Sequence, residues 1–237
     1  MKSKLVCFVC FLQQLVFAQD SLSVKIAPTH AQLFSLSPIS KNVDKVNGLV
    51  VGVGHYQNQH IQKQTINGLN VDVNPVGLGL PLFMIYLPDM IKNGTFRSKQ
   101  SDLIVEFDTV YPKLKMNGIN VSAGCFFTDT DLNGLNVSLM NRFYKLNGIS
   151  ITVFGTQAAI MNGVSIGIYN GSNNSNGLNL ALLNETIHLN GIQMGIYNYA
   201  QNVSGVQIGL FNVSRNRGLQ LGVWNVNNKR SMPFINW

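Results

Sequence analysis

The chain has 237 residues, of which 46% are hydrophobic and only 11% are charged, and its formal net charge is +7. That charged fraction is well below the ~25% of average proteins, and the basic residues are scattered along the chain without interleaved aromatic residues. The composition therefore argues against nucleic acid as a partner. The length suffices for one sizeable domain or one array of repeats.

The N-terminal residues 1–18 predict a secretory signal peptide. Lys2 and Lys4 provide a basic start, the following residues are mostly apolar, and cleavage is expected after Ala18. The apolar run is shorter than the ~20 residues that a membrane-spanning helix needs. Cleavage would leave Cys125 as the only cysteine, so neither an internal disulfide nor a cysteine metal site is expected. We therefore expect an exported protein.

The next two segments are less regular than the rest of the chain. Residues 19–45 lack a repeat and are expected to form an N-terminal cap or strands. Residues 46–116 contain degenerate repeats, beginning NGLVVGVG at Asn47 and NGLNVDVN at Asn67. They are interrupted by an irregular, proline-containing insertion from residue 75 to residue 111.

Residues 117–228 are built from a unit that recurs about every 14 residues. Examples are NGVSIGIYN from Asn162, NGIQMGIYN from Asn190 and RGLQLGVWN from Arg217, and the leading glycines lie 13 to 16 residues apart. One such unit buries too little apolar surface to offset the ordering of its own backbone. The units are therefore expected to stack on one another, as in repeat arrays.

Side chains alternate within each unit. Val206, Ile208 and Leu210 fall on one side of the segment, whereas Gln207 and Gly209 fall on the other. Alternation of this kind predicts a β-strand with one buried side. We expect the aliphatic side to be the buried one.

Two all-β architectures fit these units. Similar side chains recur at matched positions, and amide and aromatic ladders stack well between parallel strands in register. This favours a β-solenoid or stacked sheet. The alternative left open is an outer-membrane barrel of antiparallel strands. Residues 229–237 break the period and predict a C-terminal cap.

The runs GVQIGLFN from Gly205 and GLQLGVWN from Gly218, followed by KRSMPFINW at the C-terminus, resemble a family of bacterial surface repeat-containing proteins. The resemblance extends from about residue 117 to the end and is weaker over residues 46–74. It implies exposure at the bacterial cell surface or outer membrane. It supplies no catalytic residue, because the family is uncharacterised.

The sequence contains only weak matches to catalytic and metal-binding motifs. Ser165 lies in a G-x-S-x-G sequence, but it occupies an ordinary repeat position and no strand–turn–helix pattern surrounds it. The segment from Asp129 to Gly134 begins like a calcium loop and lacks the glutamate expected at its twelfth position. Cys125 is expected to be a small buried hydrophobe. The four histidines show no zinc spacing: His30, His55, His60 and His188.

We therefore predict no catalytic, cofactor-binding or metal-binding residues and no cofactor. The expected role is structural or binding, at the surface of a bacterium or on its outer membrane. The partner is expected to be an unknown surface component or a glycan, with self-association and outer-membrane contact also possible. The alternative function is a small outer-membrane barrel acting as a pore or anchor. The predicted interaction surface is the repeat ladder of Gln193, Gln207, Gln220, Tyr169, Tyr197, Phe211 and Trp224.

Overall fold

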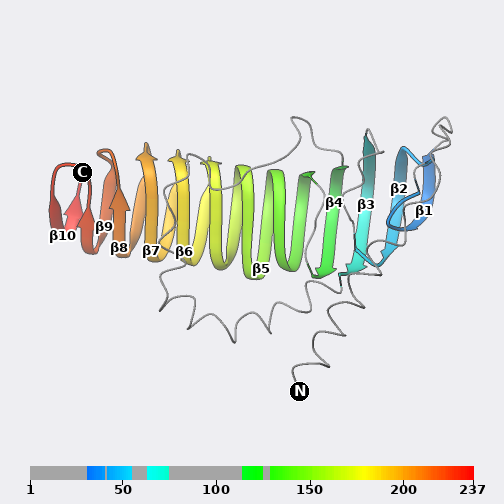
Figure 1. Cartoon of the computed structure of the whole chain (residues 1–237), viewed down its shortest axis with the longest axis horizontal. Helices are drawn as coiled ribbons and strands as arrows, with labels where there is room; N and C mark the ends of the chain where they lie inside the picture. Colours follow the sequence, from blue (N-terminus) through cyan, green and yellow to red (C-terminus); the bar gives the residue numbers. More distant parts are fainter. Residues whose placement is uncertain (1–30, 41, 55–62, 75–113, 125–128) are drawn as a thin grey trace, which may run out of the picture.

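The computed structural model describes residues 31–40, 42–54, 63–74, 114–124 and 129–237 (Figure 1). The predicted signal peptide and the whole predicted insertion lie outside these residues, as do His30, His55, His60 and Cys125. The described residues contain strands and connecting turns and no helix.

Ten strands form one sheet in chain order, and all neighbours are parallel except the last pair, β9 and β10. The strands are β1 (Ala31–Ser37), β2 (Lys45–Gly52), β3 (Gln64–Val73), β4 (Leu114–Ala123), β5 (Thr130–Ser175), β6 (Leu178–Leu189), β7 (Ile192–Val203), β8 (Val206–Ser214), β9 (Leu219–Val226) and β10 (Ser231–Asn236).

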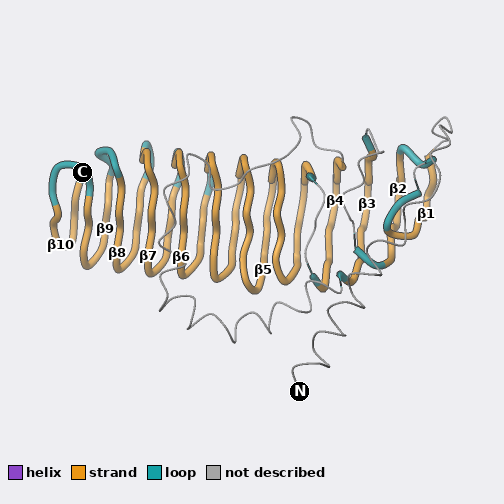
Figure 2. The backbone as a smooth tube through the Cα atoms, viewed as in Figure 1, coloured by secondary structure: helices purple, strands orange, loops and turns teal. Residues whose placement is uncertain are grey.

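The chain winds as a parallel β-solenoid, each turn stacking on the one before it (Figure 2). The continuous strand β5 is 46 residues long because it runs through several turns. The predicted solenoid is thereby confirmed, and the antiparallel alternative is wrong for all pairs except β9–β10.

Equivalent residues of successive turns lie opposite one another. Asn67 and Gly68 of β3 pair with Asn117 and Gly118 of β4, although 49 residues separate the members of each pair along the chain. The Asn-Gly step requires glycine for a physical reason. Gly118 has a φ of 138°, and a Cβ there would overlap the carbonyl oxygen of Gly68. Successive turns can therefore pack this closely at the Asn-Gly step only because glycine has no side chain.

The aliphatic side of each turn faces outward, contrary to the expectation from sequence. Gln207 and Asn212 of β8 are fully buried, whereas Leu210 of the same strand is exposed. The interior can hold amides because most of them find a partner in a neighbouring turn, as buried polar groups require. Gln207 Nε2, for example, donates to Gln193 Oε1 at 2.9 Å.

Eight of the 17 buried apolar side chains of the described residues come from one column, the position just before each Asn-Gly step or its equivalent. In this column two residues are polar: Ser175, which is buried, and Asn216 of the last turn, which is partly exposed. The apolar members of the column are Val46, Ile66, Met116, Leu132, Leu146, Met161, Leu189 and Val203. The core thus consists of one aliphatic column flanked by columns of hydrogen-bonded amides and hydroxyls.

Besides a short buried ladder of the first turns, in which Asn70 Nδ2 donates to Asn120 Oδ1 at 2.8 Å, two asparagine ladders run along the solenoid. The outer ladder links residues of the Asn-Gly steps, for example Asn190 Nδ2 to Asn176 Oδ1 at 3.0 Å. The inner ladder is fully buried and joins Asn184 to Asn198 at 2.9 Å and Asn198 to Asn212 at 2.8 Å. The inner amides also bond the backbone, since Asn198 Nδ2 donates to the carbonyl of Ile208 at 2.9 Å.

The C-terminal end of the sheet is covered by β10. This short strand runs antiparallel to β9 with an irregularity before Phe234, whose φ is 64°. Asn236 of β10 donates to Gln220 Oε1 at 3.2 Å and so extends the buried amides. The Arg230 guanidinium lies 4.1 Å from the centre of the Trp237 ring. A short, irregular last strand next to a cation limits pairing with a further chain.

Candidate interaction surface

One outer side of the solenoid is aliphatic along its whole length, and we call it the aliphatic face. Each turn contributes three outward side chains; in β7 these are Ile192, Met194 and Ile196, which are 39%, 38% and 44% exposed. The face comprises Leu49, Val51, Val53, Leu69, Val71, Val73, Ile119, Val121, Ala123, Leu135, Val137, Leu139, Ile149, Ile151, Val153, Val164, Ile166, Ile168, Leu178, Leu180, Leu182, Ile192, Met194, Ile196, Val206, Ile208, Leu210, Leu219, Leu221 and Val223. None of them is polar or charged.

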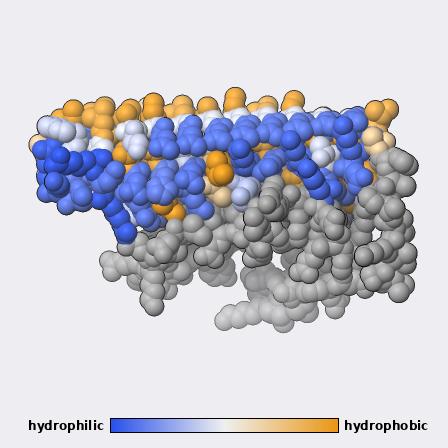
Figure 3. All heavy atoms as spheres, turned by 90° about the horizontal axis from the view of Figure 1, so that it is seen from above, coloured by the Kyte–Doolittle hydropathy of each residue, from blue (hydrophilic) through white to orange (hydrophobic). Residues whose placement is uncertain are grey.

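The aliphatic face is large for a surface that water covers. Figure 3 shows it as a hydrophobic row along one long side of the molecule, beside a hydrophilic strip. Strands ~4.8 Å apart and residues ~3.3 Å apart make the face ~43 Å long and ~13 Å wide, on the order of 600 Å². The largest apolar patch of a typical monomer covers ~300–600 Å², so this face lies at the upper end of that range, where such patches are often functional.

The aliphatic face ends at a corner where two consecutive side chains point outward. In β8 these are Leu210 and Phe211, and the inward neighbours on either side are Gly209 and Asn212. At Gly209 a Cβ would overlap the carbonyl oxygen of Gly195 and would lie 2.5 Å from Nδ2 of Asn198. The buried asparagine ladder therefore determines the shape of the corner.

The aromatic residues of the predicted ladder line this corner. Tyr197, Phe211 and Trp224 pair with one another in successive turns and are exposed. Tyr169 belongs to the same column but is partly covered. The structure thus places the four predicted aromatic residues together, next to the aliphatic face.

The three predicted glutamines lie elsewhere. Gln193, Gln207 and Gln220 stack in register, but all three are 0% exposed and bond one another inside the solenoid. Because they cannot touch a partner, the prediction that these glutamines belong to an interaction surface is wrong. Their physical role is to hold successive turns together.

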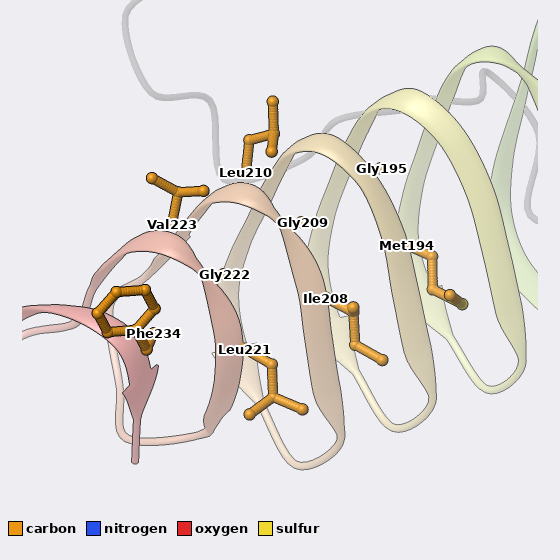
Figure 4. Close-up of a pocket in the computed structure, with 9 residues that line it drawn as sticks. All are labelled: Met194, Gly195, Ile208, Gly209, Leu210, Leu221, Gly222, Val223 and Phe234. Atoms are coloured by element: carbon orange, nitrogen blue, oxygen red, sulfur yellow. The ribbon is translucent and has the colours of Figure 1, made fainter.

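A shallow groove of ≈ 570 Å³ follows the corner over the last turns (Figure 4). Gly195, Gly209 and Gly222 form its floor, and Phe234 of β10 stands at its end. Aliphatic side chains form its walls. The groove is apolar, and its glycines are the same residues that make room for the inner asparagine ladder.

One ionisable pair lies near the corner. Tyr169 Oη donates to Glu185 Oε2 at 3.1 Å. Burial, together with the negative charge of Glu185, raises the pKa of Tyr169 well above its usual range. The pKa of Tyr197 is raised as well, mainly by burial. Both phenols therefore stay protonated at neutral pH, and the hydroxyl of Tyr169 acts there as a hydrogen-bond donor.

The residues of the weak catalytic and metal-binding motifs have ordinary structural surroundings. Ser165 is fully buried and donates to Asn170 Oδ1 at 2.7 Å, so it is a core hydroxyl. Burial raises the pKa of Asp131, against the opposing charges of Lys145 and Lys115. His188 contacts Asn202 at 3.3 Å on the polar side. The described residues contain no group of three or more histidine, cysteine or acidic side chains that could hold a metal ion.

No family model, no curated protein and no solved structure matches the chain. Within the described part of the chain, no helix has the length and apolarity needed to cross a membrane.

Proposed function

We propose that this protein is an exported bacterial surface protein that works as a binding or structural element and not as an enzyme. The observation that carries the proposal is the aliphatic face, whose side chains recur in every turn without a polar interruption. Exposed apolar surface of this extent is costly in water unless a partner covers it.

The rest of the molecule supports a role in attachment. The interior is filled with hydrogen-bonded side chains, and stacked repeats of this kind provide long, rigid surfaces for binding. The N-terminal sequence supports export, since its basic start and apolar run are typical of a signal peptide.

Export and attachment are tested together in cells that express the full chain. We expect the recovered protein to begin at Gln19, to sediment with the cell envelope and to react with a reagent that does not cross membranes. A protein that keeps Met1 and stays in the cytosol would contradict the proposal.

The role of the aliphatic face in attachment is tested by substitution. Changing Leu182 and Ile196 to serine should release the protein from the envelope into the medium. The control changes His188 and Asn202, which are exposed on the polar side of the same two turns, also to serine. If both variants stay attached equally, the aliphatic face is not the binding element.

A further inference from the structure

We propose that the partner of the aliphatic face is a lipid bilayer with anionic headgroups, on which the solenoid lies without crossing it. This inference rests on the proposed function and names its partner. It is argued from three properties of the described residues: backbone pairing, the shape of the corner and the distribution of charge.

The backbone of the aliphatic face can enter an apolar medium. Strands β2 to β9 are each paired on both sides, so the ladder bonds of the face are made within the sheet. Unpaired N–H and C=O groups are what normally keep irregular or edge backbone out of hydrocarbon. Apart from the corner, where the register between neighbouring strands skips residues such as Ile196 and Leu210, the aliphatic face therefore lies on a paired backbone and presents little polar surface to lipid.

The shape of the surface favours lipid over a second copy of this chain. Figure 4 shows Leu210 and Val223 pointing away from the bend, whereas Met194, Ile208 and Leu221 project from the flat side. The apolar surface therefore continues around a convex corner. A second rigid solenoid could cover only the flat part, whereas acyl chains can follow both parts. Aromatic residues such as Trp224 beside an aliphatic surface are typical of the membrane interface.

The charge distribution is complementary to an anionic surface. The chain contains no acidic residue after Glu185, but it contains four basic ones: Arg215, Arg217, Lys229 and Arg230. Arg217 is exposed and lies two residues before Leu219, which belongs to an outer column of the aliphatic face. Arg217 therefore lies close in sequence to the surface that would contact lipid. Each basic side chain near an anionic membrane strengthens binding, by about fivefold.

The test uses the protein processed to begin at Gln19 and vesicles of phosphatidylcholine with or without phosphatidylglycerol. We expect the protein to sediment with the anionic vesicles and to bind neutral ones at least about tenfold more weakly. Arg217→Gln should weaken binding to the anionic vesicles about fivefold. Raising the salt concentration should also weaken it, because salt screens surface charge.

The decisive comparison uses two double variants with the same added charge in the same two turns. Leu182→Asp with Ile196→Asp alters the aliphatic face, and His188→Asp with Asn202→Asp alters the polar side. The first should reduce vesicle binding more than about tenfold, because charged side chains are costly in hydrocarbon, and the second should change it less than about threefold. Circular dichroism checks folding, and the serine pair at residues 182 and 196 replaces the first variant if it does not fold.

Two results would overturn the inference. One is equal vesicle binding by both double variants. The other is light scattering that shows a dimer, abolished by the aliphatic-face variant, together with no vesicle binding; a second copy would then be the partner. Attachment to the envelope without binding to vesicles would leave the proposed function standing and remove only the lipid assignment.

Discussion

The inner asparagine ladder offers the sharpest test of which side chains lie inside the solenoid. Asn198 and Asn190 belong to the same turn, but Asn198 is fully buried and Asn190 is exposed. Asn198 accepts from Asn184 at 2.9 Å and donates to Asn212 at 2.8 Å and to the carbonyl of Ile208 at 2.9 Å. Asn190 donates to Asn176 at 3.0 Å.

Asn198→Ala should therefore lower the free energy of unfolding far more than Asn190→Ala. Each of the three lost bonds contributes ~1 kcal/mol, and Asn212 Oδ1 becomes a buried acceptor without its donor, which costs a further ~1–3 kcal/mol. The expected loss is therefore ~4–6 kcal/mol. For Asn190→Ala water replaces the lost partner, and we expect less than ~1 kcal/mol.

Guanidinium unfolding followed by circular dichroism measures both variants. The total stability of a domain is only ~5–15 kcal/mol, so the midpoint of Asn198→Ala should shift clearly. If the two alanine variants differ by less than ~0.5 kcal/mol, Asn198 is not inside, and the assignment of the aliphatic side as the outer one fails with it.

Three further outcomes follow from the same structure. In the β6 turn, Leu189→Ala should cost ~2–5 kcal/mol because the side chain is fully buried, whereas Leu182→Ala, at 50% exposure, should cost less than half as much; a thermal melt compares them. Gly191→Ala should lower stability by ~1–3 kcal/mol or more in the same melts, because its Cβ would overlap the carbonyl oxygen of Gly177. Stability should also fall as the pH rises through ~10, because tyrosine ionises there in the unfolded chain while the raised pKa of Tyr169 keeps it protonated in the folded one. Tyr169→Phe should reduce that loss, and an unchanged pH profile would show that this phenol is not buried.

Much of the fold could be predicted from local patterns. Alternation of side chains in units such as Val206–Leu210 predicts strands, and the 14-residue recurrence predicts that equivalent residues stack. The structure pairs them as expected, with Gln193 opposite Gln207 and Tyr197 opposite Phe211. These features are local because they depend only on spacing along the chain.

The site was predicted only in part. The aromatic column was found because Tyr197, Phe211 and Trp224 recur at one position of the repeat. The aliphatic face was missed as a surface, because aliphatic residues were expected in the core. One feature of the sequence did indicate that the amide side is the buried one. Glutamine and asparagine recur at fixed inward positions, where each amide can bond its copy in the next turn.

The amino-acid sequence by itself determined the strands, the period and the residues that meet in successive turns. Only the tertiary structure decided which side of each strand is inside. Alternation divides a strand into two sides without saying which one will be covered. That choice depends on the second half of each turn, where Thr186 and Leu189 are fully buried and so face the same interior as Asn179. Because in-register stacking satisfies the amides that this enclosure buries, the polar side could become the interior and the aliphatic side remained exposed.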